Sequence, residues 1–401
     1  MKKVCMITHD APFIDRRILL QAKSLIEHGY EVTIINPFGD INEDFKNVGI
    51  NYLRIKQTFN INNSLSSGKR ILRKLLPQNS YEKLKLFYFK YADTNFIDYE
   101  NELLEVASRE KFDIYVAHDL PALPIAHNIS KENNSKLVYD SHEFFTGQIA
   151  LKGKRKEFFK KIENELIGDV DLMFTVNDDI ANLFKEEYDK KDINVLFNSI
   201  EEIDSIEKKD LHNILDIGKE KKIILFQGGF LEDRNLELLV TAAKYLEDNN
   251  VLVMLGYSFL EEKLKEIAKK NNIINKKVFF MDRVPQKELL NYTAGADVGI
   301  IPYPDVDLNT KFCTPNKMFE YISSMIPIIA NKKLVTVSNF LDKYNIGTYV
   351  SFEGAELLGK ELNIVLKELD FDDIKLKLPI AKKELDWTVQ EKVLIEAYKV
   401  L

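Results

Sequence analysis

Short apolar runs alternate with helical patterns along most of this chain, and such alternation is typical of parallel sheets covered by helices on both faces. The first series of predicted strands is VCMI (4–7), VTII (32–35), IYVA (114–117), KLVY (136–139), DLMFTV (171–176) and NVLF (194–197). After a polar, acidic segment at about 199–220, the second series is IILFQG (223–228), VLVMLG (251–256), VFFM (278–281), VGIIPY (298–303) and IPIIA (326–330). We therefore predict an α/β protein of two doubly wound domains joined near residue 200.

The two predicted domains comprise residues 1–199 and 200–384, and LDWTVQEKVLIEAYKVL (385–401) predicts a last helix. Doubly wound domains bind their ligands at the carboxyl ends of the strands. Two such sheets facing each other predict one central cleft, with the candidate site residues at strand ends on both sides.

Composition narrows the class of protein. A chain of 401 residues is long enough for two separate cores, and its 45% hydrophobic and 30% charged residues are ordinary for a water-soluble protein. No apolar run approaches the ~20 residues that span a bilayer, and MKKVCMITHD leads directly into a strand, so we expect a cytoplasmic protein. The only cysteines, Cys5 and Cys313, argue against a disulfide framework and a zinc site. The net charge of −7 argues against a general nucleic-acid binder.

The segment CTPNKMFEYISSMIPIIA (313–330) predicts a proline-led turn, an amphipathic helix and a short strand. Thr314 suits the helix cap and Pro315 the first turn, while Lys317 and Glu320 share one face. The predicted buried face consists of Met318, Phe319, Ile322 and Met325. Because helix amino ends attract anions, the segment predicts a pocket for an anion and a polyol. The alternative is a surface glutamate that only stabilises the helix dipole.

This segment resembles the PNKxFEY block of the retaining glycosyltransferases of family 4, which have the GT-B fold, and the similarity extends over most of the chain. The segment 385–401 resembles the family's last helix, which crosses back to the first domain, and this implies that it belongs with residues 1–199. The resemblance implies that Glu320 binds the ribose hydroxyls of a nucleotide-sugar. It also implies that the residues leading into the helix bind diphosphate and sugar, namely Thr314, Pro315, Asn316 and Lys317. Many members carry a second glutamate eight positions earlier, where this chain has Phe312. Asp305, Asp307 and backbone amides near Thr314 are the alternatives for its contact to the donor sugar.

The segment LFQGGFLEDRNLELL predicts a strand, a glycine turn and a helix. Gly228 and Gly229 let the backbone approach a ligand, and Arg234 lies near the helix start; a purely structural turn is the alternative. The segment resembles the family's phosphate-binding block, which implies that Arg234 and Lys317 share the diphosphate. Arginine suits this role because its planar fork grips phosphate oxygens.

The segment FFMDRVPQKELL resembles the family's base pocket, and this implies that backbone groups of Arg283 and Val284 bind the nucleobase. We favour uridine over guanosine diphosphate as the leaving group. Pro285 supports the structural alternative, a turn that begins a helix.

Two pairs of a histidine and an acid end successive predicted strands: His118 with Asp119, and His142 with Glu143. A histidine in a core segment is commonly structural, but the ends of successive strands in a doubly wound sheet are also where ligands bind. The pairs resemble the HD and DSHE segments on the family's acceptor side. The resemblance implies that His142 lies near the reacting sugar and steadies charge in the transition state. His142 and Glu320 are the implied catalytic residues, and Asp140 and Glu143 are expected to orient His142 or to contact the acceptor.

The opening segment THDAPFIDRRILLQAKSLIEHGYEVTII predicts a loop and a helix after the first strand. Asp15 suits the helix cap, Gly29 suits its end, and Arg16 is placed to reach an acceptor or a phosphate. A solvated charge pair is the alternative for Arg16 and Arg17. The paired glycines that many family members carry here are missing.

Two basic clusters interrupt the acidic background, at residues 69–90 and 152–161. They predict either a solvated charged face or reversible attachment to an anionic bilayer, which would bring the protein to a lipid-linked acceptor.

The sequence thus predicts a retaining, metal-independent glycosyltransferase. We expect it to move a sugar, hexosyl or N-acetylhexosaminyl, from a nucleotide diphosphate, preferably UDP, to a hydroxyl of a glycan or lipid-linked glycan. No cofactor or metal is predicted, because the nearest Asp-x-Asp string, DVD (305–307), precedes the donor helix in a loop. A GT-B sugar-nucleotide 2-epimerase and a non-catalytic, sugar-nucleotide-binding subunit are the alternatives.

Overall fold

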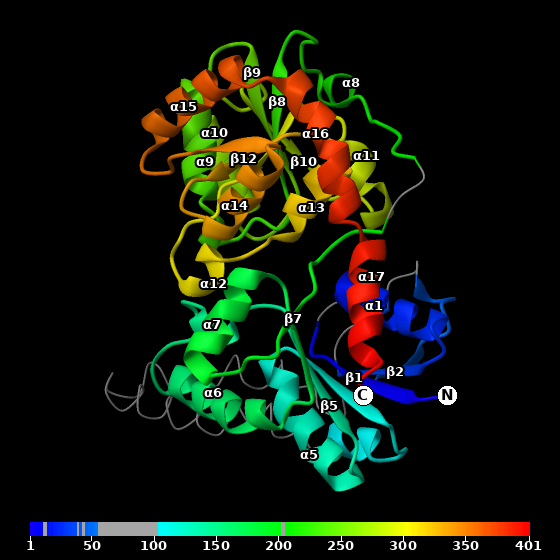
Figure 1. Ribbon diagram of the computed structural model, residues 1–401. Coiled ribbons are helices and arrows are strands. Elements are labelled where there is room, and N and C mark those ends of the chain that lie inside the picture. Colours follow the sequence, from blue (N-terminus) through cyan, green and yellow to red (C-terminus); the bar gives the residue numbers. More distant parts are fainter. Residues whose placement is uncertain (11–13, 38–39, 42–44, 55–102, 202–204) are drawn as a thin grey trace, which may run out of the picture. The chain divides into compact units, whose positions relative to one another are not determined.

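The computed structural model describes residues 1–10, 14–37, 40–41, 45–54, 103–201 and 205–401 (Figure 1). The described chain divides into two compact units. Unit 1 contains residues 1–142, 157–174 and 395–401, and unit 2 contains residues 143–156 and 175–394. The basic cluster at 69–90 lies outside the described residues.

The first sheet has seven strands, in the order β3-β2-β1-β4-β5-β6-β7. They are β1 (Lys3–Ile7), β2 (Glu31–Asn36), β3 (Asn51–Arg54), β4 (Ile114–His118), β5 (Lys136–Ser141), β6 (Leu172–Thr175) and β7 (Asn194–Val195). The pairings of β1 with β2 and β4, of β2 with β3, and of β4 with β5 are parallel. Every run predicted as a strand in this part of the chain contains one. The sequence analysis missed β3, because its four residues, NYLR, form no apolar run.

The helices described in this part include α1 (Arg16–Glu27), η2 (Leu120–Ala122), α5 (Leu123–Asn133), η3 (Phe145–Gly147), α6 (Gly153–Leu166), η4 (Ile167–Asp169) and α7 (Asp178–Tyr188). Asp15 caps α1 as predicted, accepting a hydrogen bond from the amide of Arg17. Gly29 follows the helix end in a left-handed conformation, at φ 85°. The predicted last helix is α17 (Trp387–Tyr398), and its final residues pack in unit 1, where Tyr398 contacts Tyr30 and Phe174.

The second sheet has six strands, in the order β10-β9-β8-β11-β12-β13, and all of its pairings are parallel. They are β8 (Lys222–Gln227), β9 (Asn250–Leu255), β10 (Val278–Met281), β11 (Val298–Ile301), β12 (Ile328–Asn331) and β13 (Gly347–Val350). Only β13 was not predicted; it contains a half-exposed tyrosine and lies at the sheet edge.

The helices of unit 2 include α8 (Leu211–Leu215), η5 (Glu232–Arg234), α9 (Leu236–Ala242), η6 (Ala243–Tyr245), α10 (Glu261–Lys270), η7 (Gln286–Glu288), α11 (Leu289–Thr293), α12 (Leu308–Lys311), α13 (Asn316–Ser323), α14 (Val335–Tyr344), α15 (Ala355–Glu368) and α16 (Phe371–Glu384). Among the described residues, no helix is long and apolar enough to cross a membrane.

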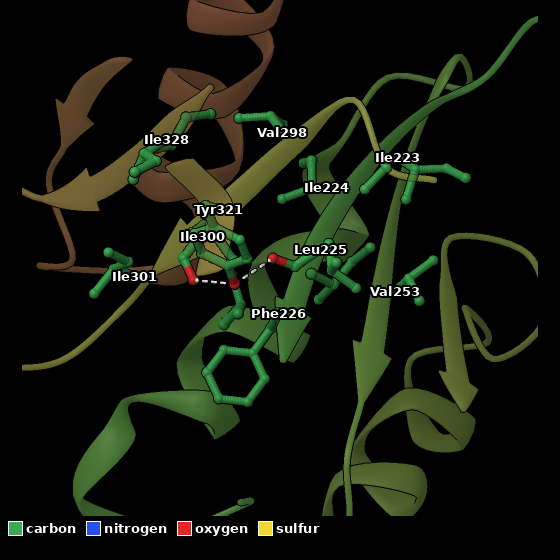
Figure 2. Close-up of a cluster of buried hydrophobic side chains, with 14 of the residues drawn as sticks. Ile223, Ile224, Leu225, Phe226, Val253, Val298, Ile300, Ile301, Tyr321 and Ile328 are labelled. Carbon is green, nitrogen blue, oxygen red and sulfur yellow. Dashed lines mark hydrogen bonds between the residues drawn. The ribbon is translucent and has the colours of Figure 1, made fainter. Parts of the chain in front are cut away.

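The order of strands reverses between β8 and β11, and this is the place where a doubly wound sheet binds its ligand. Their pairing covers Val298 with Ile224 and Gly299 with Leu225. The hydroxyl of Tyr321, from α13, lies 3.0 Å from the carbonyl oxygen of Leu225 and 3.3 Å from that of Ile300 (Figure 2). One buried hydroxyl therefore joins α13 to both strands at the point where their pairing ends.

Gly299 makes room for that tyrosine. A Cβ atom at this position would lie 2.5 Å from ring atoms of Tyr321, well inside van der Waals contact. The ring is fully buried among apolar side chains of β8, β11 and β12, so it has no space to move aside (Figure 2).

We predict that Tyr321→Phe lowers the free energy of unfolding of unit 2 by about 1–3 kcal/mol, because the buried carbonyl groups of Leu225 and Ile300 lose the one hydroxyl proton that they share. Gly299→Ala should destabilise at least as much through overlap with the ring. Urea unfolding can be followed by the fluorescence of Trp387, the single tryptophan, which is buried in unit 2. Tyr349→Phe, at a 43% exposed position on β13, is the control. An unchanged midpoint for Tyr321→Phe would show that the bridge adds nothing.

Candidate functional site

The start of α13 differs from the sequence prediction in one respect. Pro315 occupies the cap position and no side chain caps the helix, so the prediction that Thr314 is the cap was wrong. The buried hydroxyl of Thr314 instead accepts a hydrogen bond from Nδ2 of Asn177, at 3.3 Å. Met318, Phe319 and Ile322 are buried as predicted, whereas Met325 lies beyond the helix end at φ 60°. The amino end of α13 is thus left without a side-chain cap.

Lys317 is buried, with only 6% of its surface exposed. Its ammonium group lies 4.4 Å from the ring centroid of Phe226 and 4.3 Å from that of Tyr303, and it donates a hydrogen bond to the Tyr303 hydroxyl at 2.5 Å. Within the described part of the chain, no carboxylate lies at ion-pair distance from it. Buried charges are normally paired, so a lysine in this setting suits an anionic ligand.

Arg234 contributes the second positive charge to the same place. Its guanidinium lies 4.0 Å from the Tyr303 ring centroid, and its nearest acid is its sequence neighbour Asp233, at 3.6 Å. Burial raises the pKa of the Cys313 thiol to about 12, and the charges of Arg234 and Lys317 act against this rise. The positive charges of Arg234 and Lys317 therefore both lie close to Cys313 and to the Tyr303 ring. We call Phe226, Arg234, Tyr303 and Lys317 the cation cluster.

Glu320 lies one helical turn after Lys317 and is held at the end of β8. Its Oε2 accepts a hydrogen bond from Nε2 of the buried Gln227, at 2.5 Å. Oε1 of Gln227 in turn accepts from the hydroxyl of Thr293, at 2.7 Å. This chain of hydrogen bonds orients the carboxylate beside the glycine turn that follows β8. The sequence analysis did not identify Gln227, Thr293 or Tyr303.

The glycine turn brings the backbone close to these groups. Gly228 has φ 120°, and a Cβ atom there would lie 3.6 Å from Nζ of Lys317. Gly229 is exposed and its φ is ordinary. Of the predicted pair, Gly228 is the residue whose conformation requires glycine.

Arg283 and Val284 follow β10, as predicted for a base pocket. The Arg283 guanidinium lies 4.7 Å from the ring centroid of Tyr257, which follows the adjacent strand β9 and is 51% exposed. Val284 is half-buried against the core. Asn316 is exposed, and its Oδ1 accepts a hydrogen bond from Nδ2 of Asn198. An accessible aromatic ring at these strand ends is the kind of surface on which a nucleobase stacks.

The two acids considered in place of the missing glutamate both have partners. Oδ1 of Asp307 accepts from the amide of Thr310 and Oδ2 from the amide of Ile149, each at 2.6 Å. Asp305 lies 3.8 Å from the ammonium group of Lys333. Asp307 is therefore occupied as the cap of α12.

In unit 1, His118 and Asp140 occupy paired positions of β4 and β5, so their side chains leave the sheet together. Oδ2 of Asp140 accepts from Nε2 of Gln21 at 2.7 Å and lies 3.1 Å from both Nδ1 of His118 and Nε2 of His142. We call Gln21, His118, Asp119, Asp140 and His142 the histidine cluster. The sequence analysis missed Gln21, which lies on the buried face of α1.

His142 is held between two carboxylates. Besides Asp140, Oδ2 of Asp119 lies 3.3 Å from its Nδ1, and Oδ1 of Asp119 accepts from its backbone amide at 2.8 Å. Carboxylates only accept hydrogen bonds, so both ring nitrogens carry protons in this geometry. Burial and the nearby Arg17 oppose the charge, but Asp119 and Asp140 outweigh them and raise the pKa of His142 to about 9.

The same electrostatics act on the other members of the cluster. Burial lowers the pKa of His118, whose Nδ1 lies 3.1 Å from Oδ2 of Asp140 and 3.2 Å from Nε2 of His142. Burial alone would raise the pKa of Asp140, but the two histidines hold it well below its ordinary value. The atoms of His118, Asp140 and His142 also have the spacing of a metal site, which a cation would occupy only by displacing protons.

The opening of α1 contributes Arg17 to this region. Its Nη2 lies 3.1 Å from Oδ2 of Asp15. Burial would raise the pKa of Asp15, but Arg17 and His142 lower it to about 2. Arg16, the residue expected at this site, is half-buried, and the charge that acts on the cluster is that of Arg17.

Glu143 makes two hydrogen bonds within unit 2. Its Oε2 accepts from Nδ2 of Asn309, in α12, at 3.1 Å, and its Oε1 accepts from Gln148. Oδ1 of Asn309 accepts from the amide of Phe144, at 3.1 Å. Glu143 therefore fastens the segment after β5 to α12.

Comparison with known proteins agrees with this architecture. Residues 207–372 match the family described as "Glycosyl transferases group 1", a range that contains Arg234, Lys317 and Glu320. A search of curated proteins found no match.

Solved structures resemble the chain over its whole length. The sucrose-phosphate synthase of Thermosynechococcus elongatus has a TM-score of 0.72 at 12% identity and covers 100% of this chain and 98% of its own. HepE of Anabaena, in complex with UDP and glucose, has a TM-score of 0.73 at 11% identity, with 100% of both chains covered. WaaG, a glycosyltransferase involved in lipopolysaccharide biosynthesis, has a TM-score of 0.65 at 13% identity, with 99% of both covered. The predicted GT-B fold of two parallel α/β sheets is confirmed.

We predict that His142 remains protonated at neutral pH, with an NMR titration midpoint near pH 9. Because this pKa lies above the ordinary value of about 6.5, the stabilisation it provides is complete below pH 6.5 and is lost as the pH rises through about 9. Asp119→Asn should lower the midpoint, since it removes one carboxylate from the ring. Asp169→Asn, which changes the partner of the surface residue His127, should leave it in place. A midpoint near 6.5 in the wild type would contradict the double protonation.

Proposed function

We propose that this protein is a retaining glycosyltransferase of family 4 that transfers a sugar from a nucleotide diphosphate to an acceptor hydroxyl. The observation that carries the proposal is the cation cluster together with Glu320. Two positive side chains and one oriented carboxylate lie around the start of α13, beside the strand-order reversal of the second sheet. Cations suit a diphosphate and a carboxylate suits ribose hydroxyls, so the group matches the two polar parts of a nucleotide-sugar.

Arg234 and Lys317 supply what the departing diphosphate needs. Lys317 is buried and Arg234 is half-buried, and both are held in place before the reaction, so they stabilise developing negative charge more effectively than fully solvated groups do. On this proposal no metal ion is required at the diphosphate. Thr314, Pro315 and Asn316 line the start of α13, where the sugar and the diphosphate would be bound.

We infer that the nucleotide is UDP. The support is the complex of HepE with UDP and glucose, together with the exposed Tyr257 ring and Arg283 at neighbouring strand ends. The sugar, whether a hexosyl or an N-acetylhexosaminyl group, would extend from the diphosphate toward Gly228.

His142 contributes to this reaction as a held positive charge. A general base needs an unprotonated nitrogen, and both ring nitrogens of His142 face carboxylates. Asp119 and Asp140 are then positioning residues that keep the ring charged. Asp15 belongs to the same buried network of charges through Arg17.

We propose a glycan or a lipid-linked glycan as the acceptor, and α6 as a surface that contacts an anionic membrane. This helix carries exposed Lys154, Arg155 and Lys161 beside Phe158, whose surface is 59% exposed. Basic side chains around an exposed aromatic ring are typical of helices that lie at a bilayer surface.

A non-catalytic, nucleotide-sugar-binding subunit is the second candidate. It is favoured by Phe312 at the position of the second glutamate and by the occupation of Asp307 in capping α12. Donor binding without turnover, or hydrolysis, across a broad acceptor panel would support it.

We predict that Glu320→Ala weakens binding of UDP roughly ten- to hundredfold, because a charge-bearing hydrogen bond contributes about 1.5–3 kcal/mol. The measurement is calorimetric titration with UDP, GDP and their sugars, which also identifies the base. Glu356→Ala, on the exposed face of α15, is the matched control, since Glu356 pairs only with Lys360 on the surface. Unchanged affinity in a folded Glu320→Ala protein would remove Glu320 from the site.

We predict that the protein sediments with vesicles containing anionic lipid but not with neutral ones, and that salt releases it. Replacing Lys152, Lys154 and Lys161 by glutamate should weaken this binding several-fold. The same change at Lys269, Lys270 and Lys276, exposed lysines of unit 2, alters the net charge equally and should leave binding in place. Equal loss in both triple variants would show that net charge, and not α6, attracts the protein.

A further inference from the structure

Tyr303 stands at the centre of the cation cluster, although no feature of its sequence marks it. It follows β11 by two residues and is 8% exposed. Strand β11 lies between β8 and β12, so Tyr303 follows the sheet at the point where the strand order reverses.

The backbone around Tyr303 is fixed by two asparagine side chains. Nδ2 of Asn331, buried in β12, donates to the carbonyl oxygen of Tyr303 at 2.9 Å. Nδ2 of Asn235, the residue after Arg234, donates to the carbonyl oxygen of Pro302, also at 2.9 Å. The ring is therefore placed relative both to the sheet and to the turn that carries Arg234.

The ring holds two cations that would otherwise repel each other. Arg234 lies 4.0 Å and Lys317 lies 4.3 Å from its centroid, and Phe226 contacts Lys317 at 4.4 Å. The negative potential of an aromatic face attracts such groups, most strongly where water is excluded. Arg234 has Asp233 at 3.6 Å, whereas the described contacts of Lys317 include no carboxylate, so the charge of Lys317 in particular is left for a ligand.

The hydroxyl adds a further polar group. It accepts a hydrogen bond from Lys317, and a tyrosine hydroxyl that accepts one hydrogen bond still has its own proton to donate. Across the described contacts this hydroxyl donates to no protein group. A phosphate oxygen bound between Arg234 and Lys317 would meet three donors.

We propose that Tyr303 is a positioning and binding residue of the diphosphate site: its ring fixes Arg234 and Lys317, and its hydroxyl donates to the ligand. This inference rests on the proposed function, because it assigns a role within the same donor site.

The test is calorimetric titration of the wild type, Tyr303→Phe and Tyr303→Leu with UDP, GDP and inorganic pyrophosphate. Tyr303→Phe keeps the ring and should weaken diphosphate binding about 3- to 10-fold, as expected for one lost hydrogen bond. Tyr303→Leu also removes the aromatic face and should weaken binding about 10- to 100-fold. Tyr349→Leu, on the exposed edge strand β13, is the control and should bind as the wild type does.

A structural role and a positioning role are separated by two further measurements. If the ring of Tyr303 acts through Lys317, the additional loss of affinity in Tyr303→Leu over Tyr303→Phe should be much smaller in a Lys317→Met background than in the wild type. Binding of uridine, which has no phosphate, should be the same in Tyr303→Phe and the wild type. An equal additional loss for Tyr303→Leu in both backgrounds, or equal weakening of uridine and UDP, would overturn the proposal.

Failure of this inference is distinguishable from failure of the proposed function. A wild type that binds UDP or GDP, with Tyr303→Phe and Tyr303→Leu binding as tightly, overturns only the role of Tyr303. A wild type that binds pyrophosphate in a Tyr303-dependent way but no nucleoside diphosphate overturns the nucleotide-sugar function and keeps the anion site. Binding of none of the three probes overturns both.

Discussion

The hydroxyl of Tyr321 determines where the candidate donor site lies. Parallel strands that diverge leave carbonyl groups without partners, and a buried carbonyl without a donor is costly. The hydroxyl of Tyr321, on a helix, shares its one proton between the carbonyls of Leu225 and Ile300, so the helix and the diverging strands are fixed together. Lys317 and Glu320 belong to that helix, and their positions follow from this anchor. The position of the Tyr321 ring also requires glycine at residue 299, since any side chain there would displace the ring.

The two units solve the problem of buried charge in opposite ways. In the histidine cluster, each charge has an opposite charge within about one hydrogen-bond length, as for His142 between Asp119 and Asp140. Asp140 and His142 are paired within the protein, and this pairing lowers the pKa of Asp140 and raises that of His142. In the cation cluster, aromatic faces take the place of carboxylates around Lys317. The positive charge of Lys317 is therefore not neutralised, because aromatic contacts stabilise a cation without cancelling its charge.

This contrast bears on which residues meet substrate. Arg234 and the Tyr303 hydroxyl are oriented by neighbours yet keep capacity for a further hydrogen bond or charge, and Glu320 is oriented by Gln227. His118 and Asp140 are almost fully buried and are occupied with each other and with Gln21. A variant of Asp140 would therefore change the charge of His142 before it changed any contact with a ligand.

Hydrophobic periodicity alone determined the fold class, because a parallel sheet buried on both faces needs apolar strands separated by helices. Among the strands that the structure describes, it located all but β3 and β13, which lie at sheet edges, where one side needs no burial. The sequence also placed Lys317, Glu320 and Arg234 near one another, through helix spacing and resemblance. It did not reveal Tyr303, Gln227, Gln21 or Arg17, and it misassigned the cap of α13. Those roles depend on which strand ends become neighbours and on which side chains become hydrogen-bond partners in the folded chain. Such choices are made by packing between segments far apart in the chain, and only the tertiary structure decides them.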